Sequence, residues 1–276
     1  MIRSIITLFL ILFISLNTVA QTRLARAKDD LKKSSSSSSI SSSNSDDDDD
    51  IDYSFLIELA EPLVRVVGFI SYGILVESEW ELESNMHFAR FTPYPYAFDN
   101  YGDYIYEEPK AIDGITPARV TINNNFVRAD SKLWGNHLNG QLRFEKRFSI
   151  DAGYLQLFEQ GPFGTESFSL FNFTANYYRI RTPNFMLWYG PGITYVGNEV
   201  NQFGFTLNGG AEWFLGKPIG LYANYKHAFL GSDSVGILES RLKYHLKRYH
   251  LSGGFERYRL GSVFISNVAF GVGATF

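Results

Sequence analysis

The sequence predicts an all-β fold, a closed antiparallel transmembrane β-barrel of about ten strands, with eight or twelve also allowed. Three observations carry this prediction. Apolar and polar residues alternate over long stretches of residues 117–276, which gives each strand one apolar and one polar face. These stretches exceed the roughly five or six residues of an average globular strand. Aromatic residues are abundant, with 17 Tyr and 24 Phe among 276 residues.

The first 20 residues have the features of a secretory signal peptide. Arg3 precedes an apolar run from Ile5 to Leu16, and small residues lead to Ala20. The apolar run is too short to cross a bilayer core of about 30 Å. We therefore expect residues 1–20 to direct export and to be cleaved after Ala20.

Residues 21–52 are expected to form a disordered, acidic spacer. Ser34–Ser45 is almost entirely serine, and Asp46–Asp50 is a run of aspartate. Such composition buries little apolar surface and repels itself. Calcium binding is the alternative, but calcium loops alternate their ligands with turn residues around a glycine, and this run does not. We favour the solvated spacer.

Charge divides the chain into two regions. Gln21–Thr116 contains 8 basic and 19 acidic residues, whereas Pro117–Phe276 contains 16 basic and 10 acidic residues. This asymmetry suggests that the two regions lie in different surroundings. We expect residues 53–116 to form a cap, a plug or an extra hairpin outside the barrel wall.

An aromatic cluster stands out within this second region. Its rings could stack on sugars or lie in the membrane interface. We favour a loop or hairpin that packs on its own rings and turns at Asp99–Gly102. The cluster comprises Tyr94, Tyr96, Phe98, Tyr101, Tyr104 and Tyr106.

Alternation and turn residues place the barrel strands. A soluble barrel would turn the apolar faces inward, whereas a transmembrane barrel turns them towards lipid. Aromatic residues near strand ends and small residues on the polar face favour the membrane. The expected strands are Ala118–Arg128, Trp134–Phe148, Ser149–Phe158, Phe168–Arg181, Phe185–Val196, Phe203–Leu215, Ile219–Leu230, Val235–Leu246, Tyr249–Tyr258 and Ser262–Phe276.

The last of these strands resembles the terminal strand of bacterial outer-membrane barrels. Val268, Phe270, Val272, Ala274 and Phe276 alternate with small or polar residues, and the strand ends on an aromatic ring. In that family the C-terminal aromatic residue is read by the barrel-assembly machinery. The resemblance implies outer-membrane localisation in a Gram-negative bacterium, contact with outer-membrane lipid, and Phe276 as the assembly signal.

Eight charged residues are expected to face the lumen, four of each sign. In a barrel of about ten strands the lumen is narrow, and unpaired charges away from water are costly. We therefore expect a mostly filled, salt-bridged interior, with a selective passage as the alternative. The residues are Arg143, Glu145, Glu212, Lys226, Glu239, Arg241, Lys243 and Glu256.

These features predict a small outer-membrane barrel with a structural, anchoring or limited-transport role. The first alternative is an outer-membrane enzyme of protease or lipid-modifying type, in which Asp233 or a serine would assist a histidine. The second is a secreted carbohydrate-binding β-protein, whose apolar strand faces would point inward. The candidate histidines are His87, His137, His227, His245 and His250.

The sequence contains no recognisable catalytic, metal-binding or cofactor-binding motif, so we expect no cofactor. Nothing indicates a nucleic-acid partner, and the oligomeric state stays open. Lys247 and Arg248 in a predicted turn, together with Arg257 and Arg259, suggest a basic cluster. It could contact lipid phosphates or the acidic front region, although ordinary turn charge is the reading that we favour.

Overall fold

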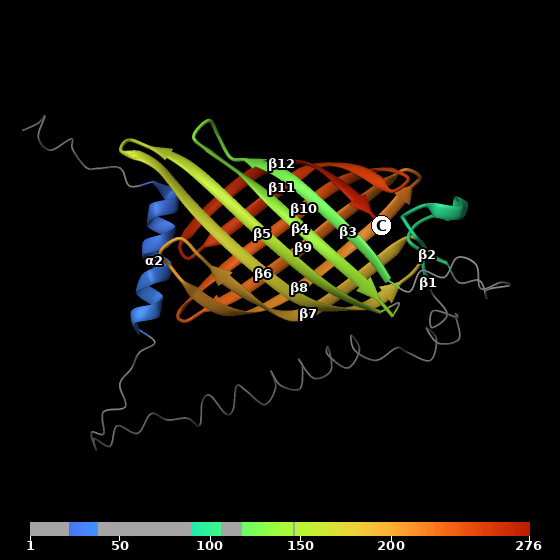
Figure 1. Ribbon diagram of the computed structural model, residues 1–276, viewed down its shortest axis with the longest axis horizontal. Coiled ribbons are helices and arrows are strands. Elements are labelled where there is room, and N and C mark those ends of the chain that lie inside the picture. The colour runs from blue at the N-terminus through green and yellow to red at the C-terminus, as the bar shows by residue number, and fades with distance from the viewer. Residues whose placement is uncertain (1–21, 38–89, 106–117, 146) are drawn as a thin grey trace, which may run out of the picture.

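The computed structural model describes residues 22–37, 90–105, 118–145 and 147–276, and these form a closed barrel with an element at each end (Figure 1). The expected signal peptide, Tyr106 and His87 lie outside these residues. The wall consists of β3 (Ala118–Arg128), β4 (Leu133–Phe144), β5 (Phe148–Gly161), β6 (Gly164–Arg181), β7 (Phe185–Val196), β8 (Gln202–Gly216), β9 (Ile219–Leu230), β10 (Asp233–Leu246), β11 (Tyr249–Leu260) and β12 (Val263–Thr275).

All ten strands pair with their sequence neighbours in antiparallel fashion, and β12 pairs with β3 to close the barrel. Closure leaves no unpaired strand edge facing lipid. The predicted fold class is therefore confirmed, with ten strands. Several strand ends differ from the expected ones by one to four residues. The clearest case is the expected strand Trp134–Phe148, because Glu145 and Arg147 lie in the turn between β4 and β5.

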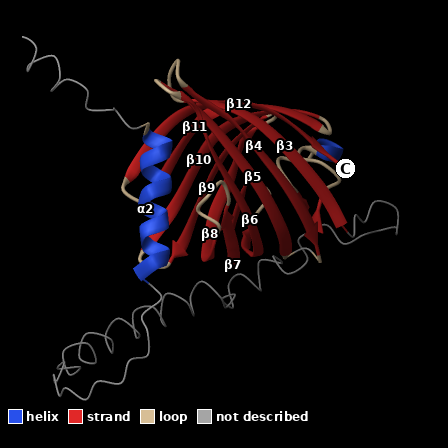
Figure 2. Cartoon of the chain, turned by 60° about the vertical axis from the view of Figure 1, so that its left-hand side comes forward, coloured by secondary structure: helices blue, strands red, loops and turns tan. Residues whose placement is uncertain are grey.

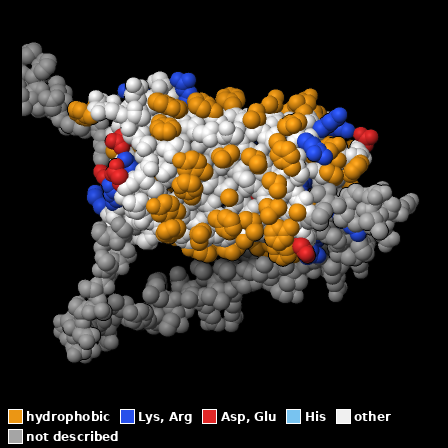
Figure 3. Space-filling model, viewed as in Figure 1, with side chains coloured by type: hydrophobic (Ala, Val, Ile, Leu, Met, Phe, Trp, Pro, Cys, Tyr) orange, Lys and Arg blue, Asp and Glu red, His pale blue; other side chains and the backbone are white. Residues whose placement is uncertain are grey.

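The apolar faces of the strands point outward, as Figure 3 shows on one side of the molecule. Phe205, Leu207 and Val268 are among the many large apolar side chains that are about half exposed on the outer wall. A water-soluble barrel would bury such a belt, whereas hydrocarbon solvates it. This orientation is the opposite of what the secreted carbohydrate-binding alternative requires.

Helix α2 (Arg23–Ser37) lies across one end of the barrel, the end that we call the helix rim (Figures 1 and 2). It is not long and apolar enough to cross a membrane. Leu24, Ala27 and Leu31 are fully buried, since their spacing places them on one helix face. Two basic side chains of α2 reach the rim, with Arg23 Nε 2.9 Å from Glu159 and Lys28 Nζ 2.6 Å from Glu166.

Helix α2 corrects the expectation of disorder for residues 21–52 over the part that the structure describes. The composition of this segment is polar, and that polarity concealed the apolar stripe of Leu24, Ala27 and Leu31. These three side chains are buried only because the barrel offers an apolar surface on which they pack. The remaining residues of the expected spacer lie outside the described ranges.

The opposite end, the hairpin rim, receives a small hairpin that we call the plug hairpin (residues 90–105). It contains β1 (Arg90–Phe91), the short helix η2 (Ala97–Asp99) and β2 (Tyr104–Ile105), and β1 pairs with β2. Tyr104 is fully buried and Tyr96 almost so. The Tyr96 hydroxyl donates a hydrogen bond to the Ile219 carbonyl at 2.6 Å, which joins the hairpin to the wall.

The interior of the barrel contains three layers between these two elements. Beneath α2 lies an apolar layer that includes Leu155, Phe168 and Ile265. At the hairpin rim lies an aromatic layer of Phe91, Tyr96, Tyr104, Tyr178, Met186, Trp188 and Phe214. Buried charged side chains occupy the space between the two apolar layers. Most of the ionisable groups inside the barrel therefore lie in that middle layer.

Candidate functional site in the barrel interior

Seven of the eight charged residues expected in the lumen are buried in the barrel. They are Arg143, Glu212, Lys226, Glu239, Arg241, Lys243 and Glu256. Glu145 is the exception. It was expected to face the lumen, but it is exposed in the turn after β4. Its φ of 55° belongs to the turn, and the strand ends at Phe144, so the alternation no longer applies.

Glu256 is the centre of the main charge network. Its carboxylate accepts hydrogen bonds from Arg241 at 2.5 Å and from the Tyr258 hydroxyl at 2.5 Å. His137 Nδ1 lies 2.8 Å from the same carboxylate. All four side chains are buried, so these bonds replace the water that the charges lose. Sequence reasoning did not assign His137 and Tyr258 to the network.

Glu239 lies beside this centre with looser contacts. Its carboxylate oxygens are 3.7 Å from Lys226 Nζ, 3.5 Å from Arg241 and 3.4 Å from His137 Nδ1. The ligand atoms of His137, Glu239 and Glu256 all lie within 4.8 Å of one another, which would suit a metal ion geometrically. Arg241 and Lys226 already balance the two carboxylates, so an added divalent cation would carry uncompensated charge. The arrangement fits an ion-pair network better than a metal centre.

A second ion pair lies nearer the hairpin rim. Lys243 Nζ on β10 is 2.9 Å from Glu212 Oε1 on β8, and the pair lies over β9 inside the barrel. The ammonium also lies 4.2 Å from the centre of the Tyr222 ring, an arrangement in which the ring face attracts the cation. The polar middle layer therefore extends to the base of the plug hairpin.

The plug hairpin is joined to the wall through Asp103. Arg119 donates two hydrogen bonds to its carboxylate, at 2.5 and 2.7 Å, and Arg143 donates another. The Arg143 guanidinium also contacts the Tyr104 hydroxyl and lies over the Tyr178 ring, 4.2 Å from its centre. Three buried charges from three segments thus meet at one point.

This contact perturbs the ionisation of Asp103. Burial on its own would raise the pKa of the carboxyl, but the guanidinium groups of Arg119 and Arg143 hold that pKa well below its usual range. The carboxylate is therefore charged over the whole physiological range of pH. Sequence reasoning missed both Asp103 and Arg119. The alternation of Arg119 with Thr121 and Asn123 on β3 was a usable signal for the arginine, whereas nothing in the sequence marks Asp103.

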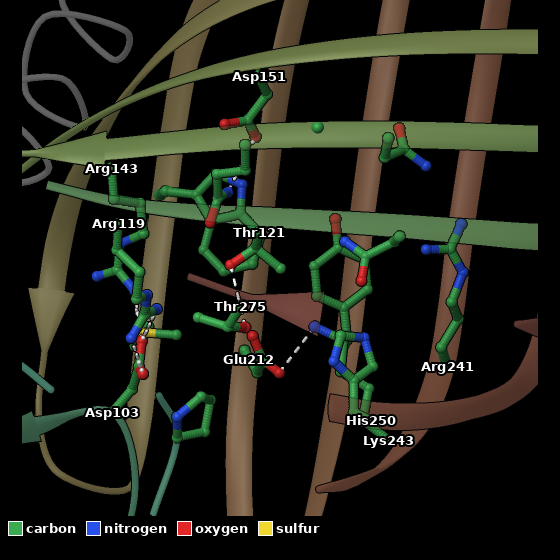
Figure 4. A pocket seen from close by; sticks show the side chains of 18 of the residues that line it. Asp103, Arg119, Thr121, Arg143, Asp151, Glu212, Arg241, Lys243, His250 and Thr275 are labelled. Carbon is green, nitrogen blue, oxygen red and sulfur yellow. Dashed lines mark hydrogen bonds and ion pairs between the residues drawn. The ribbon is translucent and has the colours of Figure 1, made fainter. Parts of the chain in front are cut away.

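A small cavity lies among these groups (Figure 4). Its volume is about 60 Å³, which is enough for on the order of four water molecules. Arg119 and Arg143 line it near Asp103, and Arg241, Lys243 and His250 line it on other strands. A space of this size and polarity suits water or a small ion and excludes a sugar or a nucleotide.

The aromatic cluster of the sequence divides between two environments. Tyr96 and Tyr104 are buried, and Tyr94 is partly buried in the plug hairpin. Phe98 and Tyr101 are 71% and 73% exposed at its tip. The chain reverses mainly through residues 95–99, slightly before the expected turn at Asp99–Gly102. The buried rings pack on wall residues such as Trp188 and Phe214 as well as on one another.

The described histidines are distributed over separate surroundings. His137 belongs to the Glu256 network, and His227 lies on the wall with its ring nitrogen 3.1 Å from the Tyr225 hydroxyl. The rings of His245 and His250 lie near the plug hairpin, tilted by 44° with their centres 5.4 Å apart. None of these contacts among the described residues joins a histidine to a serine or an aspartate, which is the pairing that the enzyme alternative requires.

The similarity of this chain to known proteins is limited to solved structures of low sequence identity. No protein-family model matches the sequence, and no curated protein matches it. The solved structure of Ail from Yersinia pestis is 12% identical, covers 58% of this chain and 98% of its own, and has a TM-score of 0.33. An outer membrane channel from Pseudomonas putida F1 is 9% identical, covers 62% and 100%, and has a TM-score of 0.40.

A third similar structure is the KdgM porin, which is 14% identical, covers 56% of this chain and 99% of its own, and has a TM-score of 0.35. These likenesses concern the fold alone. The apolar exterior, the polar interior and the closed wall define a transmembrane β-barrel.

Proposed function

We propose that the protein is a closed outer-membrane barrel with an anchoring role, which holds its own N-terminal region at the membrane. The observation that carries the proposal is the presence of an N-terminal element at each end of the lumen. Helix α2 covers the helix rim, and the plug hairpin fills the hairpin rim. A barrel built for free diffusion would leave at least one mouth open.

The interior supports the same proposal. Glu256, Glu212 and Asp103 each bind a basic side chain from another strand or segment, and the cavity between them has room for only a few water molecules. Removing one member of such a pair leaves an uncompensated buried charge. The network therefore favours a filled and persistent interior over a pore that conducts at rest.

Planar-bilayer conductance of the refolded full-length chain tests the proposal. We expect no steady conductance from the wild type or from Asp99→Ala, which removes an exposed carboxylate from the tip of the plug hairpin. Asp103→Ala removes the buried carboxylate and should produce small, brief openings, which show that the assay detects a passage. Large steady steps from the wild type would contradict the closed barrel.

Limited transport is the second candidate, because the cavity of about 60 Å³ is lined by charged side chains and lies directly behind Asp103. It would require the plug hairpin to move. Small steps from the wild type at a frequency comparable with that of Asp103→Ala would favour this role over anchoring.

A further inference from the structure

The outer wall of the barrel carries very few charges. Among the charged residues of strands β3–β12, only Arg128, Arg257 and Arg259 are exposed. All three are arginine, and none forms an ion pair within the described residues. Acidic side chains in these strands are buried or partly buried and face inward. The outer face of the strands therefore carries three positive charges and no exposed negative charge.

The three arginines lie towards the helix rim, two on β11 and one on β3. Arg257 and Arg259 stand two residues apart on β11, next to the β11–β12 turn, and Arg259 pairs with Phe264 on β12. Arg128 is the last residue of β3 and pairs with Val268 of β12. Only β12 separates Arg128 from β11, but Val268 also pairs with Phe255, so Arg128 lies level with Phe255. Its backbone is therefore about 12 Å from that of Arg257 and about 16 Å from that of Arg259.

The ring of Phe264 contacts both arginines of β11. The guanidinium carbons of Arg257 and Arg259 lie 5.1 and 5.8 Å from the centre of its ring. Arg257 is the deeper of the two in the wall, and its contact with Phe264 directs its head towards the rim. Long basic side chains extend in this way when their backbone lies in hydrocarbon and their charge belongs at the interface.

The position of these arginines at the membrane restricts the anions that could neutralise their positive charge. An arginine on the lipid face costs about 2–4 kcal/mol at the centre of the bilayer and much less near the interface. At the interface the available anions are lipid phosphates. A guanidinium binds phosphate oxygens through paired N–H groups, and such charge-assisted hydrogen bonds are strong.

We propose that Arg257 and Arg259 form a binding site for the phosphate of a membrane-lipid headgroup at the helix rim. The acyl chains of the lipid would lie on the apolar wall formed by Phe255, Val268 and Phe270. This inference rests on the proposed membrane location but not on the anchoring role or on a closed lumen.

The structure separates this patch from the other half of the expected basic cluster. Lys247 and Arg248 lie in the turn that precedes β11, whereas Arg257 and Arg259 lie at the opposite end of that strand. The two pairs are on opposite rims, so the sequence-based cluster was wrong. Lys247 and Arg248 therefore provide a control with the same change of charge at a site that lacks the patch geometry.

Native mass spectrometry of the full-length protein in detergent tests the proposal. The probes are phosphatidylglycerol and a galactosyl diacylglycerol, which lacks phosphate. We expect the wild type to retain phosphatidylglycerol in preference to the galactolipid. The double variant Arg257→Gln, Arg259→Gln should bind phosphatidylglycerol about tenfold less, whereas Lys247→Gln, Arg248→Gln should bind as the wild type does. Arg257→Lys, Arg259→Lys should give an intermediate value.

Each outcome decides one point. Equal retention of the two lipids by the wild type would overturn the proposal, as would an equal loss in the Lys247 and Arg248 control, which would show a general effect of charge. Displacement of phosphatidylglycerol by inorganic phosphate would assign the site to the free anion instead. Circular dichroism confirms that each variant is folded. Because conductance is not measured, failure here is distinguishable from failure of the proposed anchoring function.

Discussion

Asp103 shows how much one side chain contributes to the closure of this barrel. It lies in the plug hairpin, yet its hydrogen-bond partners, Arg119 and Arg143, belong to the wall. Without it, two buried guanidinium groups would face each other without a counter-charge. Ion pairs of this kind add little when compared with an apolar replacement, but breaking one of them is expensive.

We therefore predict that Asp103→Asn destabilises the folded protein by about 3–5 kcal/mol. Denaturant unfolding in lipid vesicles measures this change. Asp99→Asn is the matched control, since Asp99 pairs with Lys217 at 2.9 Å on the exposed surface, and it should leave the unfolding midpoint nearly unchanged. Equal midpoints for the two variants would show that the Asp103 contact does not hold the hairpin.

The next scale is that of a whole element, helix α2. Apolar packing and ion pairs both attach this helix to the barrel. Its ion pairs with Asp130 and Glu199 are exposed or nearly so. Hydrogen bonds from Lys32, together with the charge of Lys28, lower the pKa of Glu199. Burial alone would raise the pKa of Asp130, but hydrogen bonds from the backbone of Lys132 and from Arg23 lower it overall.

The attachment of α2 should consequently weaken in acid. A carboxyl whose pKa is lowered by folding stabilises the folded state above its ordinary pKa, and the contribution is lost as the pH falls towards the lowered value. We expect α2 to stay attached at neutral pH and to loosen below about pH 4. Fluorescence of a dye at Lys33→Cys, in a chain that has no other cysteine, reports the change.

Glu199→Gln is the control for this experiment. It removes one titrating group, so the change in fluorescence between neutral and acid pH should become smaller. A dye at Asp99→Cys on the plug hairpin serves as the reference for effects of pH on the fluorophore itself. An α2 signal that is flat from neutral pH to about pH 3 would refute electrostatic attachment.

For the whole molecule, the last residue, Phe276, allows the assembly of the barrel to be distinguished from its stability. The backbone of Phe276 exchanges hydrogen bonds with Val120, at 3.0 and 2.8 Å, and so continues the β12–β3 junction. The Phe276 ring is 61% exposed on the outside. The ring is therefore not needed to hold the closed wall together.

We propose that the Phe276 ring acts in assembly, as the resemblance to outer-membrane barrels implies. Phe276→Ser should lower the amount of barrel recovered in the outer membrane several-fold and change the unfolding free energy of refolded protein by about 0.5 kcal/mol or less. Phe229→Ser, at another exposed ring, is the control for lost apolar surface. Normal membrane levels of the Phe276 variant would exclude this role for the ring.

Much of the wall could be predicted from the sequence because a strand repeats every two residues. That period assigns Arg143, Glu212 and Glu256 to the lumen and Phe205 and Val268 to the lipid without knowledge of any contact. It fails at Glu145, where the chain turns after Phe144 and the period is interrupted. The same regularity identifies ten strands, because each apolar face has to meet hydrocarbon.

Long-range contacts could not be predicted in this way. The burial of α2, the meeting of Asp103 with Arg119, and the separation of Lys247 from Arg257 all depend on how segments far apart in the chain are brought together. The sequence by itself determined the barrel, its lipid-facing surface and most of its inner charges, since these follow from local periodicity. Only the tertiary structure decided what fills the two ends and which charges pair, because those contacts form only once the wall has closed.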